Sequence, residues 1–445
     1  MCFLMQAAPS DHVICARWVV PVMPEGSVLD YHSVVVREGR IDAILPTREL
    51  GEAHQNLPKV ELPNHLVTAG LINTHGHAAM TLLRGYADDL PLMDWLNNHI
   101  WPVEDRFVDE AFVFDGTSLA VAEMIASGTT CAADTYFFPD AVSQAMTENG
   151  FRGQVCIPVV QFPNAWAESE EQHLEKGLAF HDSVRDSSLI TTALAPHAPY
   201  TVSDNGFSQV VKYSAELQIP IHLHLHETKG EVEAAVDDDG QRPFERMQRL
   251  GLLSSRLQTV HMTELTEGEI HTLADKGAHV AHCPESNMKL ASGICPVHSL
   301  LEHGVNVALG TDGAASNNDL DLLGEARTAA FLTKVATGDA TSVSAARALS
   351  MATINGARLL GLDDEIGSLE KGKSADIIAV DFTDIAFQPM HNPLSQLIYA
   401  ANGTQVSYTW IAGRCVYQDG RNTSLDVSAL KTRVESWQKK IQSKL

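Results

Sequence analysis

Two histidines, His75 and His77, follow directly on an apolar stretch and give the first indication of chemistry. The stretch from Leu66 to Ile72 is short and contains β-branched residues, which predicts a buried strand. Residues i and i+2 of an extended chain point to the same side, so the two imidazoles would lie together. Gly76 between them adds no side chain and lets another group approach closely. The pair therefore suggests a metal site, although His-x-His can also arise by chance in a chain with 20 histidines.

Further polar side chains follow several other strand-like stretches. They are His197, the group His222, His224, His226 and Glu227, then His261, the run from His282 to Asn287, and Asp312. Histidines scattered through a core would not collect at one end of successive strands, whereas the strand ends of a (β/α)8 barrel are where its active site lies. His75, His77, His224 and Asp312 would supply three imidazoles and a carboxylate. Such a set suits a zinc ion that keeps one position open for water.

The elements that would position these residues form a repeated pattern between about residue 66 and residue 362. Short apolar stretches alternate there with segments of helical periodicity, which is typical of βα units and a parallel sheet. Eight strands of an α/β fold, a (β/α)8 barrel, are predicted at Leu66–His75, Thr129–Thr135, Gln154–Val160, Ile190–Pro196, Ile219–Leu225, Leu257–His261, His279–Cys283 and Val305–Thr311. Helices are predicted at Glu110–Ser127, Asn205–Leu217, Pro243–Leu250, Glu267–Lys276 and Ser342–Leu360, the last ended by Gly361.

Both ends of the chain contain short β-type stretches separated by turns, such as Val13 to Val20 and Ala375 to Asp381. Residues 1–65 and 366–426 are therefore predicted to form one small β-sandwich domain beside a barrel of residues 66–365. Residues 427–445 are predicted to form a C-terminal helix that is solvated over Lys431 to Lys440.

The composition is that of a globular protein and limits its partners. The 445 residues carry a formal net charge of −25, which disfavours nucleic acids and anionic membranes. The first twelve residues lack the features of a secretory signal, and no stretch has the roughly 20 apolar residues of a membrane span. We therefore expect a cytoplasmic protein. Seven scattered cysteines without a Cys-x-x-Cys pair indicate neither a disulfide framework nor a thiolate zinc site.

The segment from Gly70 to His77, followed by His224, His261 and Gly310-Thr311-Asp312, resembles the amidohydrolase superfamily of metal-dependent hydrolases. The segment from Gly367 to Asp376 is similar to that superfamily's return into its small β domain. Members with two metals bridge them with a carboxylated lysine after the fourth strand, but no lysine lies between residues 176 and 212 here. The resemblance therefore implies one divalent metal per chain. Zinc is expected, while iron and manganese would also suit such ligands.

The same resemblance assigns roles around the metal. In the mononuclear deaminases a ligand histidine precedes a proton-transferring glutamate by three residues, and His224 and Glu227 match this spacing. His222, His224 and His226 would all point to the same side of a strand, so which of them binds the metal stays open. His261 and Asp312 would orient and deprotonate the attacking water, and Glu227 would carry a proton to the substrate.

A finer similarity, over residues 80–89, 95–96, 102–106 and 312–318, connects the chain to the branch that deaminates 5′-methylthioadenosine and S-adenosylhomocysteine. It implies hydrolytic deamination of an adenine ring in a small-molecule nucleoside. Glu104 and His197 would bind the ribose hydroxyls, because a carboxylate accepts two vicinal hydroxyls. Trp95 would also contact the substrate. A homo-oligomer is common among such barrels.

The two substrates differ in the group on the 5′ sulfur, and a buried amino-acid tail would need a cationic partner. The segment from residue 155 to residue 182 contains no arginine, whereas Phe162 and Trp166 offer apolar surface. We therefore expect a preference for 5′-methylthioadenosine. Arg152, which precedes the third strand, and Arg84 are the two arginines that could still reach the tail.

Two alternatives remain open at this point. A deaminase or chlorohydrolase of another aromatic heterocycle, such as guanine or a triazine, would not need a ribose-binding Glu104, and Glu104 would then be a surface helix acid. A catalytically dead scaffold is less favoured, because such proteins lose metal ligands and every expected ligand is present here.

Overall fold

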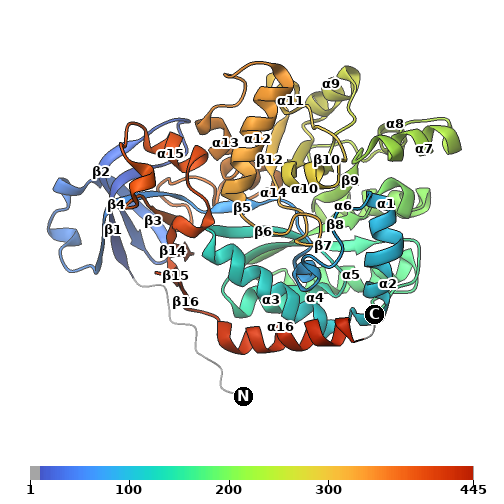
Figure 1. Cartoon of the computed structure of the whole chain (residues 1–445), viewed down its shortest axis with the longest axis horizontal. Coiled ribbons are helices and arrows are strands. Elements are labelled where there is room, and N and C mark those ends of the chain that lie inside the picture. Colours follow the sequence, from blue (N-terminus) through green and yellow to red (C-terminus); the bar gives the residue numbers. More distant parts are fainter. Residues whose placement is uncertain (1–10, 444–445) are drawn as a thin grey trace.

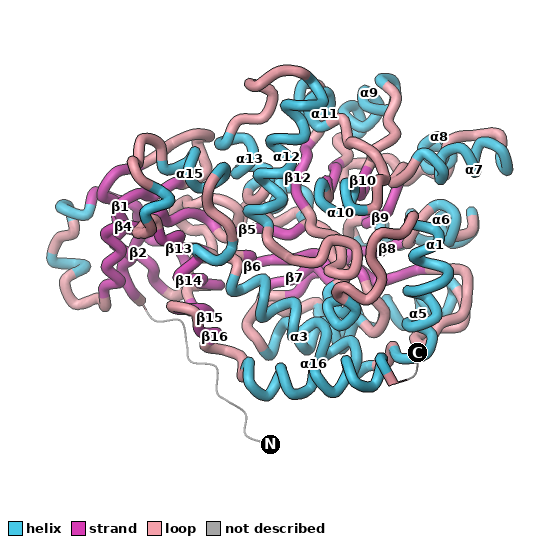
Figure 2. The backbone as a smooth tube through the Cα atoms, viewed as in Figure 1, coloured by secondary structure: helices cyan, strands magenta, loops and turns pink. Residues whose placement is uncertain are grey.

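The computed structural model describes residues 11–443, which form a parallel barrel beside a smaller sheet (Figures 1 and 2). The barrel strands run in sequence order, from β5 to β12, and every neighbouring pair is parallel. Their bounds are β5 Leu71–Asn73, β6 Thr129–Thr135, β7 Arg152–Val159, β8 Ile190–Pro196, β9 Ile221–Leu225, β10 Leu257–His261, β11 His279–His282 and β12 Asn306–Leu309. The two outer strands approach each other where Thr74 N donates to Leu309 O (2.9 Å). The predicted (β/α)8 fold is confirmed.

Helices cover the outside of the barrel (Figure 1). The main ones are α3 Glu110–Ala126, α4 Pro139–Glu148, α5 Glu170–Val184, α6 Asp204–Leu217, α7 Lys229–Asp239, α8 Pro243–Arg249, α9 Glu267–Lys276, α11 Val297–Glu302 and α12 Leu322–Thr337. The predicted helix Ser342–Leu360 is instead two helices, α13 (Ala345–Met351) and α14 (Ile354–Leu360). The break follows from Thr353, which leaves helical geometry, and from Ala352 O, which accepts from Ile72 N (2.9 Å). Gly361 ends α14 in the left-handed conformation, as predicted.

The apolar run that we expected to be the first barrel strand, Leu66–His75, divides at Gly70. Its first part belongs to β4 (Lys59–Ala69) of the smaller sheet, and only Leu71–Asn73 joins the barrel. Gly70 is required at the crossing, because a Cβ there would lie 2.1 Å from Thr130 Oγ1. β5, which His75 and His77 follow, is therefore joined directly to β4 of the smaller sheet.

The smaller sheet contains strands from both ends of the chain. They are β1 His12–Val20, β2 Leu29–Arg37, β3 Arg40–Pro46, β4, β13 Ile377–Asp381, β14 Val406–Ile411, β15 Arg414–Gln418 and β16 Arg421–Asn422. β4 pairs with β13, so the sequence correctly places both ends in one β domain. Hydrogen bonds join all eight strands of this small domain into one mixed sheet. One face, including Ile14 and Val34, belongs to the main core, and the other carries a small cluster of Val13, Cys15 and Val35.

The C-terminal helix α16 (Val427–Gln442) lies along α3 (Figure 1), and although most of Lys431 to Lys440 is exposed as expected, one face of the helix is buried. Leu430, Trp437 and Ile441 are buried, at the spacing of one helical face. Asp115 of α3 holds the helix by accepting from Trp437 Nε1 (2.9 Å) and from Arg433 Nε (2.6 Å).

Within residues 11–443, six cysteines are free thiols, and no helix is long and apolar enough to cross a membrane. Cys2 lies outside the described residues.

Candidate active site

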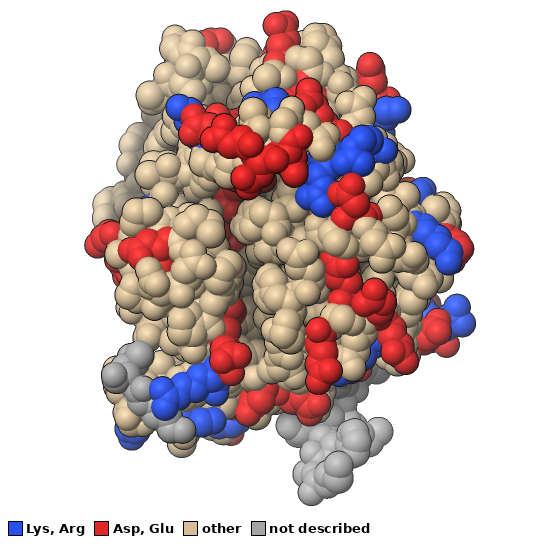
Figure 3. Space-filling view, turned by 90° about the vertical axis from the view of Figure 1, so that its right-hand side faces the viewer, with Lys and Arg blue, Asp and Glu red and all other residues tan. Residues whose placement is uncertain are grey.

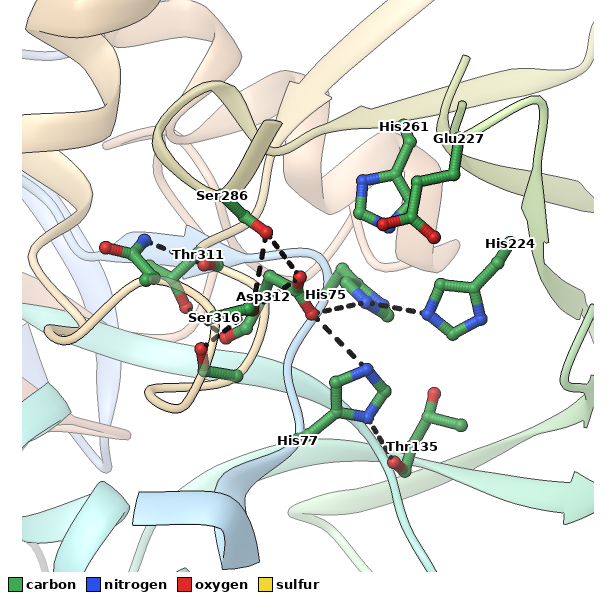
Figure 4. A network of polar contacts seen from close by, with 12 residues as sticks. His75, His77, Thr135, His224, Glu227, His261, Ser286, Thr311, Asp312 and Ser316 are labelled. Atoms are coloured by element: carbon green, nitrogen blue, oxygen red, sulfur yellow. Dashed lines mark hydrogen bonds and ion pairs between the residues drawn. The ribbon is translucent and has the colours of Figure 1, made fainter. Parts of the chain in front are cut away.

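The side chains of His75, His77, His224 and Asp312 converge where their strands end (Figure 4). Asp312 Oδ1 lies 3.2 Å from His75 Nε2 and 3.3 Å from His77 Nε2, and His224 Nε2 lies 3.1 Å from His75 Nε2. All except His77 are less than a tenth exposed. Three imidazoles and a carboxylate oxygen from three strand ends therefore gather around His75, and among the described residues the groups close enough to share one ion are His75, His77 and Asp312, and His75, His224 and His261.

The hydrogen bonds of the outer ring nitrogens fit this set to a divalent metal. His77 Nδ1 donates to Thr135 O (2.7 Å), and His224 Nδ1 donates to His197 O (2.7 Å). A carbonyl oxygen can only accept, so the proton lies on Nδ1 and the lone pair of Nε2 points to the centre. This is the tautomer that a metal ligand needs.

The geometry separates the three histidines of β9. His224 alone turns its Nε2 to the centre. His222 Nε2 lies behind it, 2.8 Å from His75 Nδ1, and His226 Nε2 accepts from Phe244 N (3.1 Å). The three-residue spacing to Glu227 therefore selects the histidine that the structure places at the centre.

Asp312 is held with one oxygen toward the histidines. Its Oδ2 accepts from Ser286 Oγ (2.6 Å) and from Ser316 Oγ (2.8 Å), which leaves Oδ1 facing the centre. The sequence motifs contain both serines, yet their role as partners of Asp312 was not predicted.

Glu227 and His261 lie together on the other side of the centre (Figure 4). His261 Nε2 is 3.8 Å from Glu227 Oε1, and His261 Nδ1 is 2.8 Å from Asn287 Oδ1. Burial raises the pKa of Glu227, and His261 opposes that rise. A carboxyl group with a raised pKa is suited to proton transfer near neutral pH.

A cavity of about 360 Å³ opens beside these residues. Predicted contacts Glu104, His197 and Trp95 all line it. Much of the remaining wall is apolar and comes from a helical segment, α1 (Leu92–Trp95), a π-helical turn (Leu96–Ile100) and α2 (Trp101–Phe107). Tyr136, which was not predicted, donates from its hydroxyl to Glu104 Oε1 (2.6 Å).

Arg152 is the predicted substrate contact that the structure contradicts. It is the first residue of β7, at the end of the barrel opposite the cavity, and it does not line the cavity. Its guanidinium forms a buried pair with Asp376, with Nε 2.9 Å from Oδ2 and Nη2 3.2 Å from Oδ1. Arg84 does not line the cavity either, because Glu123 and Asn318 O bind its guanidinium. A residue at the start of a barrel strand lies at the amino end of the barrel, whereas the cavity lies at the carboxyl ends of the strands.

The chain is similar to known proteins over most of its length. Residues 66–416 match the model of the amidohydrolase family, and this match covers most of the chain. The chain belongs to the amidohydrolase family. Two relatives, from Saccharophagus degradans and Teredinibacter turnerae, are 47% and 46% identical over 98% of both chains. Each is named 5-methylthioadenosine/S-adenosylhomocysteine deaminase.

Solved structures share the fold of this chain. An adenosine deaminase from Xanthomonas campestris with bound zinc is 48% identical and superposes with a TM-score of 0.96. It covers 98% of this chain and 100% of its own. An atrazine chlorohydrolase from Arthrobacter aurescens with zinc covers 96% of this chain and 99% of its own, at a TM-score of 0.88. At 21% identity it shows the fold alone.

Proposed function

We propose that this amidohydrolase is a zinc-dependent deaminase whose preferred substrate is 5′-methylthioadenosine. The observation that carries the proposal is the cavity beside the metal-facing residues: it combines the carboxylate of Glu104 with an apolar wall and, among residues 11–443, is lined by no lysine or arginine. The near relatives named as deaminases support the reaction class. The reaction consumes one water molecule, replaces the amino group at C6 by oxygen and releases ammonia.

His75, His77, His224 and Asp312 would hold the zinc, because their donor atoms gather around His75 with free lone pairs. Zinc bound there would supply hydroxide at neutral pH by lowering the pKa of a water molecule from ~15.7 towards ~7. His261 and Asp312, which both line the cavity beside this centre, are assigned to orient this water and to accept its proton.

Glu227 is assigned the proton transfer to N1 of the adenine ring. Protonation at N1 lets the ring accept the attacking oxygen at C6 without building up negative charge. The raised pKa of the buried Glu227 keeps a proton available for this step. His261 Nε2 lies 3.8 Å from Glu227 Oε1, so the two groups would act on the same part of the substrate.

The ribose is assigned to Glu104 and His197. Tyr136 occupies one lone pair of Glu104 Oε1, which leaves Oε2 to accept from the ribose hydroxyls. His197 donates to or accepts from Thr201 Oγ1 through Nδ1 (3.1 Å), so its Nε2 remains for the substrate. Burial lowers the pKa of His197 to about 4, which makes the ring a neutral partner.

The 5′ group is assigned to the apolar wall, where Leu96, Trp101 and Phe162 line the cavity. Among residues 11–443, no lysine or arginine lines it, whereas Glu104, Asp105, Glu227 and Asp312 do. A methylthio group suits this environment, and the carboxylate of a homocysteine tail would stay unpaired. Acidic side chains are also spread widely over the face that carries α7 and α8 (Figure 3).

Ammonia release from a panel of compounds tests the proposal. We expect kcat/KM for 5′-methylthioadenosine to exceed that for S-adenosylhomocysteine by about 10-fold or more, because an unpaired buried charge costs at least a few kcal/mol. Equal values, or a preference for the longer substrate, would show that the tail is bound by groups outside this cavity. Activity confined to free bases such as guanine, or to triazines, would contradict the nucleoside assignment.

A further inference from the structure

Below the metal-facing imidazoles, a chain of three hydrogen bonds crosses the barrel core. His75 Nδ1 lies 2.8 Å from His222 Nε2, and His222 Nδ1 lies 2.9 Å from Gln258 Oε1. Gln258 Nε2 in turn lies 2.7 Å from Leu359 O, in the last turn of α14. His222 and Gln258 are register partners on β9 and β10, and none of the three side chains is more than 1% exposed. Water therefore does not compete for these bonds.

The carbonyl of Leu359, at the far end of this series of hydrogen bonds, fixes the direction of every bond in the series. Leu359 O can only accept, so the amide nitrogen of Gln258 faces it and Oε1 faces His222. Oε1 also only accepts, so His222 carries its proton on Nδ1 and offers the lone pair of Nε2. His75 must then donate from Nδ1, which leaves its Nε2 lone pair facing Asp312 and His224.

We propose that His222 and Gln258 are positioning residues that hold His75 in the tautomer able to bind the metal. His77 and His224 obtain the same tautomer directly from backbone carbonyls, whereas His75 obtains it only through this relay. Without the relay, His75 could place its N–H on the nitrogen that faces the metal. The inference rests on the metal site of the proposed function, and it concerns residues that contact neither metal nor substrate.

A neighbouring glutamine provides a matched control. Gln154 of β7 is 1% exposed and its Nε2 donates to Leu360 O (3.2 Å), beside the carbonyl that Gln258 uses. In the described structure its Oε1 has no hydrogen-bond partner, so Gln154 is not connected to a metal-facing histidine. Gln258→Met and Gln154→Met each remove one amide and one bond to α14 at similar volume.

Zinc affinity of the purified full chain, measured by competition with a fluorescent chelator, tests the relay. We expect Gln258→Met to weaken zinc binding by about 10- to 100-fold, and Gln154→Met by less than about 3-fold. Thermal melting of the metal-free variants should show a larger loss in Gln258→Met, which gives up the bonds to Leu359 O and His222, than in Gln154→Met, which gives up one bond. Unchanged zinc affinity in Gln258→Met, or equal weakening in both variants, would overturn the inference.

A second measurement needs no folded Gln258 variant. Nitrogen NMR of histidine-labelled, metal-free wild-type protein reports which ring nitrogen carries the proton, and the signals lost in His222→Phe and in His75→Phe identify the two residues. A proton on His222 Nδ1 and on His75 Nδ1 supports the relay, and a proton on either Nε2 refutes it. If the wild type binds zinc but releases no ammonia, the proposed function fails while the relay stands.

Discussion

Glu104→Ala tests how the substrate is recognised, because Glu104 is proposed to contact the ribose and to take no part in the chemistry. The side chain lies in the cavity wall and is fixed by one bond, from the hydroxyl of Tyr136 (2.6 Å). Burial raises the pKa of Glu104 and the Tyr136 bond opposes that rise. Replacing Glu104 by alanine removes the acceptor for two vicinal hydroxyls and leaves the metal-facing residues in place.

The expected loss follows from the number of hydrogen bonds. A hydrogen bond to a charged group contributes about 1.5–3 kcal/mol, so two bonds contribute roughly 3 kcal/mol or more. Since about 1.4 kcal/mol corresponds to a factor of ten, kcat/KM for 5′-methylthioadenosine should fall by ~10²-fold. Tyr136→Phe removes only the bond that orients the carboxylate and should cost less, on the order of 10-fold.

The assay compares 5′-methylthioadenosine with its 2′,3′-dideoxy counterpart in the wild type, Glu104→Ala and Tyr136→Phe. The wild type should discriminate against the dideoxy compound by ~10²-fold, and Glu104→Ala should lose most of this discrimination. If Glu104→Ala lowers kcat/KM for both compounds by the same factor, Glu104 supports the fold or the chemistry, and the ribose assignment is refuted.

Three other predictions concern the metal, the proton and stability. His75→Ala should lose both zinc, by metal analysis, and activity, because three remaining ligands hold a cation poorly; full activity in the metal-stripped variant would exclude the site. Glu227→Gln should keep its metal and lose at least ~10²-fold in kcat, and unchanged turnover would move the proton transfer elsewhere. Burial lowers the pKa of His173 to about 4 from its usual 6.5, so the unfolded chain binds more protons between these values. The free energy of unfolding should therefore fall as the pH falls from 6.5 to 4, by at most ~1.4 kcal/mol per pH unit from this group. Chemical unfolding across this range should show a smaller slope in His173→Gln, and an equal slope would show that His173 ionises normally in the folded protein.

Hydrophobic pattern predicted the barrel well where a strand is bounded by turns on both sides. β6, β8 and β10 have the predicted bounds, and each begins after a turn or bend that separates it from the preceding element. The first strand was predicted too long, since Leu66–Ala69 and Leu71–Asn73 are equally apolar but belong to different sheets. Hydropathy predicts that a residue is buried, but it does not predict which sheet buries it.

The sequence predicts which residues form the site better than it predicts the hydrogen bonds that orient them. Side chains that follow barrel strands share one face, so His75, His77, His224 and Asp312 could be grouped from their order along the chain. The partners Thr135 O and His197 O are backbone atoms, which every residue possesses, and no sequence pattern distinguishes them. Arg152 was misplaced because nearness in sequence to the third strand says nothing about which end of that strand it occupies.

The charge of the cavity constrains the substrate more firmly than its shape does. The wall carries four carboxylates and, within the described chain, no lysine or arginine, while the proposed metal would supply positive charge only at the reacting end. A 5′-phosphate or a free carboxylate at the other end would therefore lose its hydration without gaining a cation. A neutral thioether loses no ionic hydration there and gains contact with Trp101 and Phe162. The same absence of cations that excludes nucleotides thus makes the amino-acid tail of S-adenosylhomocysteine unfavourable, although both compounds present the same adenosine to the metal.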